Sequence, residues 1–85
     1  MIPNVVEVRV LPNLLLWLRF RTGELKVFDA KPYLDRGRFL ELRNQELFGQ
    51  ASVAFGTVEW PNGVDFDPED LYELSVPAET AAQSL

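Results

Sequence analysis

Neither cysteine nor histidine occurs among the 85 residues of the chain. Without cysteine there is no disulfide, no thiol nucleophile and no thiolate ligand for a metal. Without histidine the chain lacks the usual general base near neutral pH and the commonest metal ligand in proteins. Catalysis by Asp, Glu, Lys, Tyr or Ser stays open. The two absences nevertheless favour a protein that is not an enzyme, with no catalytic residues, no metal and no cofactor.

Long hydrophobic runs are also missing. The longest apolar run, residues 14–18, has the length of a strand, whereas a helix that spans a bilayer needs about 20 apolar residues. The first four residues, Met-Ile-Pro-Asn, lack the basic and then apolar layout of a signal peptide. We therefore expect a cytoplasmic protein that does not contact membranes.

Basic residues are absent after Arg43. The first 43 residues hold all eight Lys and Arg with five acidic residues, for a net charge of +3, and the remainder has a net charge of −8. This polarity could guide a basic partner onto the acidic half, or the two signs could pair across the folded domain. Nucleic-acid binding requires a broad basic surface, so a chain with an overall charge of −5 is not expected to bind nucleic acid.

The residues that are present support one small domain. The length leaves no room for a second domain, and a hydrophobic content of 47% is sufficient for one core. Period-2 alternation predicts strands at residues 5–11, 14–21 and 25–29, with a tight turn at Gly23. The first strand places its even-numbered valines on one face: Val6, Val8 and Val10. We expect a three-stranded antiparallel meander.

Short helices are predicted in the middle and near the end of the chain. Residues 32–37 and 45–48 each fit one helical turn, and Asn44 is a suitable cap for the second. Asp67 followed by Pro68 predicts the start of another short helix, because Asp is favoured at the N-cap and Pro at the first helical position.

The strand pattern returns between these helices. Residues 51–55 and 57–60 predict a hairpin with its turn at Gly56. The expected fold class is therefore α+β: an antiparallel β-meander of three strands, two short helical turns, a further β-hairpin and a short C-terminal helix. Residues 1–77 would form this single domain, and residues 78–85 would form a disordered tail.

Three segments resemble a known family: residues 20–24 (FRTGE), 36–42 (RGRFLEL) and 60–72 (WPNGVDFDPEDLY). On these segments and the strand meander, the chain resembles the small bacterial proteins grouped as domain of unknown function family 2442. The resemblance extends over residues 4–73, and the third segment is its specific part. It implies an α+β domain that occurs alone or ahead of a helix-turn-helix, often encoded beside another small protein. A toxin–antitoxin-like or regulatory pair is implied; catalytic residues are not.

The candidate interaction site consists of Trp17, Arg19 and Arg21, which alternate along the more polar face of the second strand. If the short helices cover that face, Trp17 is a core residue. If they do not, Trp17 anchors a protein partner, because aromatic residues and Arg dominate binding hot spots. The partner would be a second copy of the chain or the product of a neighbouring gene. We therefore expect a non-enzymatic small cytoplasmic protein-interaction or regulatory module, one member of a toxin–antitoxin-like pair.

The alternative is a small-ligand-binding domain with a pocket between the sheet and the middle helices. Its candidate lining residues are Tyr33, Arg38, Trp60, Asp65 and Tyr72. No spacing requires such a pocket, since the aromatic residues of this set fit the core or its rim equally well.

A cluster of carboxylates surrounds the predicted helix start: Asp65, Asp67, Glu69, Asp70 and Glu73. Carboxylate oxygens suit Ca²⁺ or Mg²⁺. The calcium-loop pattern fails, however, because Pro68 falls within the segment and the central Gly is missing. We interpret the cluster as a helix cap with side chains that favour the helix dipole, and no metal site is expected.

Overall fold

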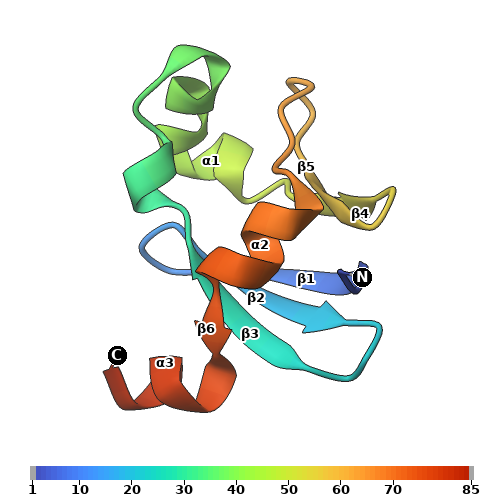
Figure 1. Ribbon diagram of the computed structural model, residues 1–85. Coiled ribbons are helices and arrows are strands. Elements are labelled where there is room, and N and C mark those ends of the chain that lie inside the picture. The colour runs from blue at the N-terminus through green and yellow to red at the C-terminus, as the bar shows by residue number, and fades with distance from the viewer. Residues whose placement is uncertain (1, 85) are drawn as a thin grey trace.

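The main sheet is an antiparallel meander of β1 (Val5–Leu11), β2 (Leu15–Phe20) and β3 (Leu25–Asp29), to which β6 (Val76–Pro77) adds on the far side of β3 (Figure 1). The computed structural model describes residues 2–84, without the side chains of 82–84. The three predicted strands are confirmed. The second begins one residue later than predicted, because Leu14 lies in the turn with φ at 60°.

A bulge changes which residues of β1 face the core. The register shifts between Val5, which pairs with Phe20, and Glu7, which pairs with Arg19. As a result Val5 is 2% exposed while Val6 is 40% exposed, so the predicted shared face of the valines is only partly buried. The alternation in the sequence could not show this extra residue, because a bulge depends on the partner strand.

Three short helices follow β3: η1 (Lys31–Tyr33), η2 (Gly37–Arg43) and α1 (Gln45–Phe48). The predicted cap of α1 is confirmed. The side-chain oxygen of Asn44 accepts hydrogen bonds from the backbone N–H groups of Glu46 (2.9 Å) and Leu47 (3.3 Å). No helix of this length is stable alone, and packing of Leu34, Leu42 and Phe48 on the sheet holds the segment.

A second hairpin joins β4 (Ser52–Ala54) to β5 (Thr57–Glu59), as predicted. Both turn residues have positive φ, 52° at Phe55 and 78° at Gly56. The carbonyl oxygen of Gly56 accepts a hydrogen bond from the backbone N–H of Val5 (2.9 Å), so the hairpin tip is tied to the start of β1. Glycine suits position 56 because its φ lies in the left-handed region, and a Cβ atom there would in addition stand 2.5 Å from Asn4 Oδ1.

The chain ends with α2 (Pro68–Leu74), β6 and α3 (Ala78–Ser84). The predicted cap of α2 is confirmed, since Asp67 Oδ1 accepts from the backbone N–H of Glu69 (2.8 Å). Where a disordered tail was expected from residue 78, the structure has α3, with Ala81 buried. Residue 85 lies outside the described residues. Alanine is the best helix former, and small residues allow the helix to approach the sheet closely.

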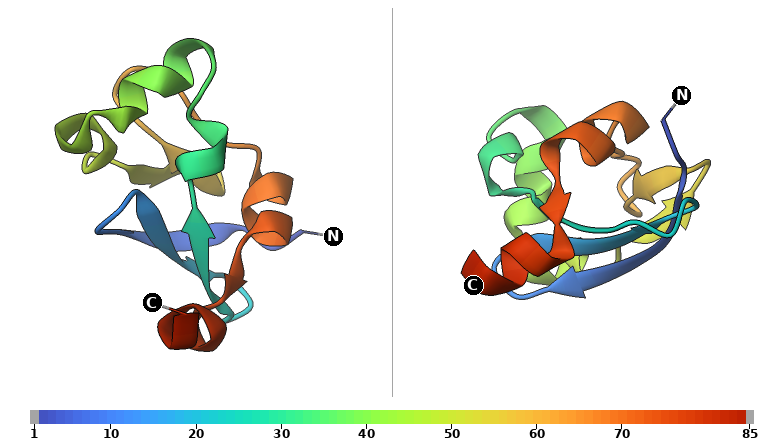
Figure 2. Two further views of the ribbon diagram at one scale, coloured as in Figure 1. Left: turned by 90° about the vertical axis from the view of Figure 1, so that its left-hand side faces the viewer. Right: turned by 60° about the horizontal axis from the view of Figure 1, so that its bottom comes forward.

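The elements form layers on both faces of the sheet (Figure 2). The main core lies between the inner face and the layer that contains α1, α2 and the second hairpin. Its largest buried side chains are Phe20, Phe28, Phe48, Leu16, Leu18, Leu34, Leu42 and Leu71. On the other face, α3 covers a small second cluster of Leu15, Val27 and Ala81. Among residues 2–84, no helix has the length and apolar character that crossing a bilayer requires.

Candidate functional site

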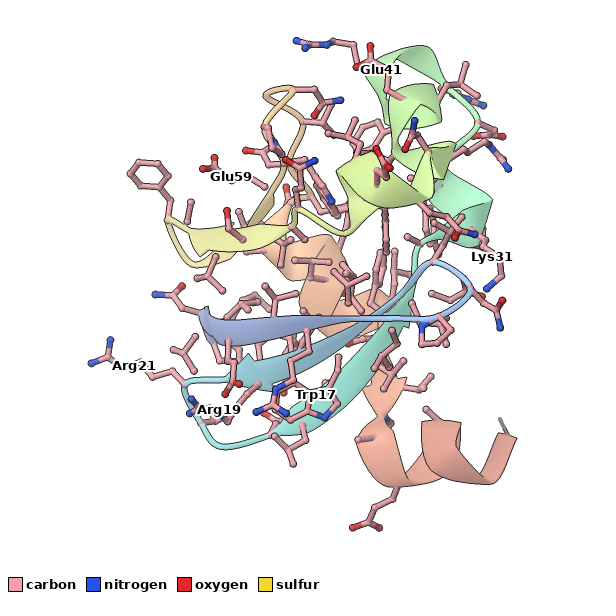
Figure 3. All side chains as sticks on the ribbon, turned by 180° about the vertical axis from the view of Figure 1, so that it is seen from behind. Trp17, Arg19, Arg21, Lys31, Glu41 and Glu59 are labelled. Carbon is pink, nitrogen blue, oxygen red and sulfur yellow. The ribbon has the colours of Figure 1, made fainter. Side chains whose placement is uncertain are left out.

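The face of the sheet that points away from the main core is here called the outer face. Three rows of cross-strand neighbours form it: Leu11–Leu15–Asp29, Arg9–Trp17–Val27 and Glu7–Arg19–Leu25. Figure 3 shows Trp17 and Arg19 on the side of the sheet away from α1 and β4. The middle helices therefore cover the inner face, and Trp17 is not part of the main core.

Trp17 is half-buried at the centre of the outer face. On one side its ring packs against the second cluster, and on the other the guanidinium carbon of Arg9 lies 5.1 Å from the ring centroid. A guanidinium at this distance attracts the face of the ring. The indole is thus held in one orientation, while part of its surface remains accessible.

Glu7 fixes two guanidinium groups beside Trp17. One carboxylate oxygen accepts from Arg9 Nε and the other from Arg19 Nε, each at 3.0 Å. Hydrogen bonds from the two arginines hold the pKa of the Glu7 carboxyl below its ordinary value. Two positive charges share one negative charge, so this cluster has a net positive charge on an otherwise acidic protein.

Helix α3 covers only the end of the outer face near Leu15. A hollow of about 230 Å³ remains between α3 and the sheet, lined by apolar side chains with Asp29 and Thr80 at its rim. Leu74 and Val76, which line this hollow, are each more than 40% exposed, and so is Leu25 at the other end of the outer face. The outer face therefore combines apolar and charged side chains, and the chain itself covers it only in part.

Arg21, the third predicted interaction residue, lies beyond the end of β2. Its backbone N–H donates to the carbonyl oxygen of Asn4 (2.8 Å), and its side chain lines a separate hollow of about 230 Å³ with Ile2, Pro3 and Thr22. The structure brings Trp17 and Arg19 together and leaves Arg21 at the end of the sheet (Figure 3).

The predicted ligand pocket divides into two neighbouring hollows that share Asp65. The first, of about 240 Å³, has an aromatic floor that includes Phe28 and Phe66, with Asp65, Asp67 and Asp70 among its lining residues. Tyr33 belongs to this hollow. Its ring stacks on Phe28 with centroids 5.5 Å apart and planes 15° apart.

The second hollow, of about 410 Å³, is lined by η2 and the loop after β5, and it contains Arg38 and Asp65. The guanidinium of Arg38 donates to the carbonyl oxygen of Asn62. This contact ties η2 to the turn that follows β5, so Arg38 has a structural partner within the chain.

Trp60 and Tyr72, the other two predicted pocket residues, line neither hollow. Trp60 is 2% exposed, and its Nε1–H donates to the carbonyl oxygen of Phe48 (2.9 Å). The Tyr72 hydroxyl donates to the carboxylate of Glu24, and this hydrogen bond raises the pKa of the phenol above its ordinary value. The side chain of Lys26 lies over the Tyr72 ring. Both residues stabilise the fold.

The carboxylates near α2 do not gather into a metal site. Across residues 2–84, no three acidic side chains lie close enough together to hold a metal ion. Asp67 caps the helix, and Asp70 faces the first hollow.

Two charged residues beside Trp17 and one exposed aromatic residue elsewhere on the surface were not identified from the sequence. Arg9 and Glu7 join Trp17 only through the register of β1 on β2, which alternation alone does not define. Phe55 is 97% exposed at the tip of the second hairpin and has positive φ. The sequence does contain a signal for Phe55: a Phe-Gly pair stands at a hairpin turn, where Asn-Gly is the usual pair.

The family model described as "Protein of unknown function (DUF2442)" matches residues 5–77. The match begins at the first residue of β1 and ends at the last residue of β6, so it contains the whole main sheet. No curated protein and no solved structure matches the chain.

Proposed function

The chain belongs to the DUF2442 family, and we propose that it is a non-enzymatic protein-interaction module that binds its partner through the outer face around Trp17. The partner is a second copy or the product of a neighbouring gene, in a regulatory or toxin–antitoxin-like pair in the cytoplasm. One observation supports the proposal above the others: Trp17 is half-buried and held in place on a face that α3 covers only in part.

The composition of this face is that of a binding hot spot. Hot spots are enriched in Trp and Arg, and the residues around them exclude water. Trp17 has Arg9 against one side of its ring and Arg19 in the next row. Because Glu7 pairs with both guanidinium groups, part of the side-chain entropy that binding costs is already lost in the free chain.

The charge of the face indicates the chemistry of the partner. The cluster of Glu7, Arg9 and Arg19 has a net positive charge and lies beside exposed apolar side chains. A partner surface with carboxylates next to an apolar patch would complement it.

Co-expression with the neighbouring gene product, followed by affinity capture, tests the proposal. Trp17→Ala should weaken capture by about 30-fold or more, the equivalent of a hot-spot residue worth about 2 kcal/mol. Leu40→Ala is the matched control, because Leu40 is an apolar residue that is 49% exposed on η2. Absence of both self-association and partner capture in the wild type would refute the proposal, as would equal capture by the two variants.

The second candidate function is small-ligand binding in the two hollows that share Asp65. The aromatic floor and acidic lining of the first hollow favour an organic cation. A thermal-shift screen of small amines against the wild type and Tyr33→Ala distinguishes the two functions. A stabilisation that Tyr33→Ala abolishes and Trp17→Ala retains would support ligand binding, and no shift with any amine would count against it.

A further inference from the structure

The outer edge of β1 has no partner strand within residues 2–84, because β1 is the first strand in the order of the main sheet. We propose that this edge pairs with the same edge of a second copy of the chain, antiparallel and with Val8 on the two-fold axis. The inference shares with the proposed function only the premise that the chain binds protein. It concerns the edge of the sheet, not its outer face.

The backbone of Val8 is directed toward this edge. The backbone N–H of Phe20 donates to the carbonyl oxygen of Glu24 (2.9 Å), so the backbone groups of Phe20 face β3. Successive residues of an antiparallel ladder alternate in direction, so the residues of β2 that face β1 are those opposite Glu7 and Arg9. Glu7 and Arg9 therefore bond to β2, and Val8 between them directs its N–H and C=O away from the sheet.

Among the registers of two antiparallel β1 strands centred on residue 7, 8 or 9, charge selects one. With residue 7 on the axis, Glu7 faces Glu7 of the second copy; with residue 9 on the axis, Arg9 faces Arg9. Like charges directly opposite each other destabilise a strand pair. With Val8 on the axis, each Glu7 faces Arg9 of the other copy, and two pairs of opposite charge form.

The same register matches the apolar side chains. Val6 is placed opposite Val10 of the second copy, and these residues are 40% and 37% exposed in the single chain. Val8 faces its own equivalent. β-branched residues opposite each other stabilise antiparallel pairs, so the exposed valines of β1 gain contacts that the single chain does not provide.

The strand pair is small, and the dimer is therefore concentration-dependent. Stable protein interfaces bury at least about 1,200 Å², which one pair of short strands does not reach. The bulge next to Val5 and the bond from Val5 to Gly56 end the available edge on one side. Five residues, 6–10, are left for pairing.

Charge exchange at the edge tests both the dimer and its register. Light scattering of the wild type over a concentration series should show a monomer that converts to a dimer. Arg9→Glu alone and Glu7→Arg alone should each remain monomeric, because each places like charges opposite each other. An equimolar mixture of the two variants should form a heterodimer, because each variant then supplies the charge that the other lacks. Native mass spectrometry resolves the heterodimer by its mass.

Two further variants separate pairing from folding. Val8→Pro removes the central N–H donor at an edge position where proline is tolerated, and it should abolish the dimer with circular dichroism unchanged. Glu46→Arg makes the same charge change as Glu7→Arg at an exposed position of α1 and should leave the dimer intact.

A wild type that stays monomeric at every concentration would overturn the inference, and so would two single variants whose mixture yields no heterodimer. If the neighbouring gene product is captured through Trp17 while the wild type alone stays monomeric, the proposed function holds and only the edge pairing fails. If the wild type does not self-associate and Val8→Pro abolishes capture of that product, a strand of the other protein occupies the edge. This outcome also overturns self-pairing.

Discussion

The indole N–H of Trp60 donates to the backbone carbonyl of Phe48 across 2.9 Å in the buried core. This bond joins the end of β5 to the end of α1, and the two rings lie 5.6 Å apart. It ties residues 60–72, the segment most specific to the family, to the middle helices, which have few backbone bonds to the rest of the fold.

Trp60→Phe should lower the free energy of unfolding by about 2 kcal/mol, because it removes the donor and leaves part of the ring volume unfilled. The Phe48 carbonyl keeps a second bond from the backbone N–H of Ala51 (3.3 Å), which limits the loss. Urea unfolding followed by circular dichroism measures the change. Leu40→Ala, an exposed substitution, should stay within about 0.5 kcal/mol of the wild type. Equal stability of Trp60→Phe and wild type would contradict the role assigned to the bond.

Asp67→Ala should cost about 1 kcal/mol of unfolding free energy, since it removes the side-chain acceptor from the first turn of α2. Asp67→Asn keeps an acceptor oxygen at the same place and should stay close to the wild type. Thermal unfolding of the two variants side by side checks this prediction. If Asn destabilised as much as Ala, the carboxylate charge and not the cap would be the important feature.

The stability contributed by Glu7 should depend on pH. Because Arg9 and Arg19 lower the pKa of the folded Glu7 carboxyl, the contribution is present above the ordinary Glu value of about 4.3. It is lost as the pH falls through the lowered value. The difference in melting temperature between wild type and Glu7→Gln should therefore shrink on acidification. The comparison is made at low protein concentration, with Glu46→Gln as the control; a difference that is constant with pH would exclude the ion pairs as its source.

Phe55→Asn should raise the free energy of unfolding by about 0.5–1 kcal/mol. Residue 55 has φ at 52°, where Asn is tolerated better than an aromatic residue, and Asn-Gly is the favoured hairpin pair. Since Phe55 is 97% exposed, no packing is lost. Chemical denaturation of the variant and of Phe55→Ala tests this; a destabilised Asn variant would show that the Phe ring makes contacts in solution.

Local signals made most of the fold predictable. Val5–Leu11, Leu25–Asp29 and Gln45–Phe48 have the predicted boundaries, since alternation, tight turns and the Asn44 cap act over a few residues. η2, α3 and β6, the last strand of the main sheet, were not predicted. β6 consists of two residues whose strand conformation depends on pairing with Lys26 and Val27, a contact that no local pattern encodes.

The candidate surfaces were predictable only in part. Alternation placed Trp17 and Arg19 on one face of the second strand but left open whether helices cover that face, and the partners of Trp17 come from the register of β1. Two of the predicted pocket residues line neither hollow, because each stabilises the fold: Trp60 is in the core, and the Tyr72 hydroxyl bonds to Glu24. Composition does not distinguish a buried aromatic residue from one that lines a hollow.

The pairing of β6 with β3 has a consequence for the order of folding. The meander of β1, β2 and β3 closes through short turns and is complete after the first 29 residues, whereas Val76 pairs with Val27, which lies 49 residues earlier in the chain. Contacts between distant residues carry the larger loop-closure entropy and form slowly. The segment after α2 should therefore dock last, so a ribosome-bound chain would expose the β3 edge and the outer face until β6 and α3 emerge.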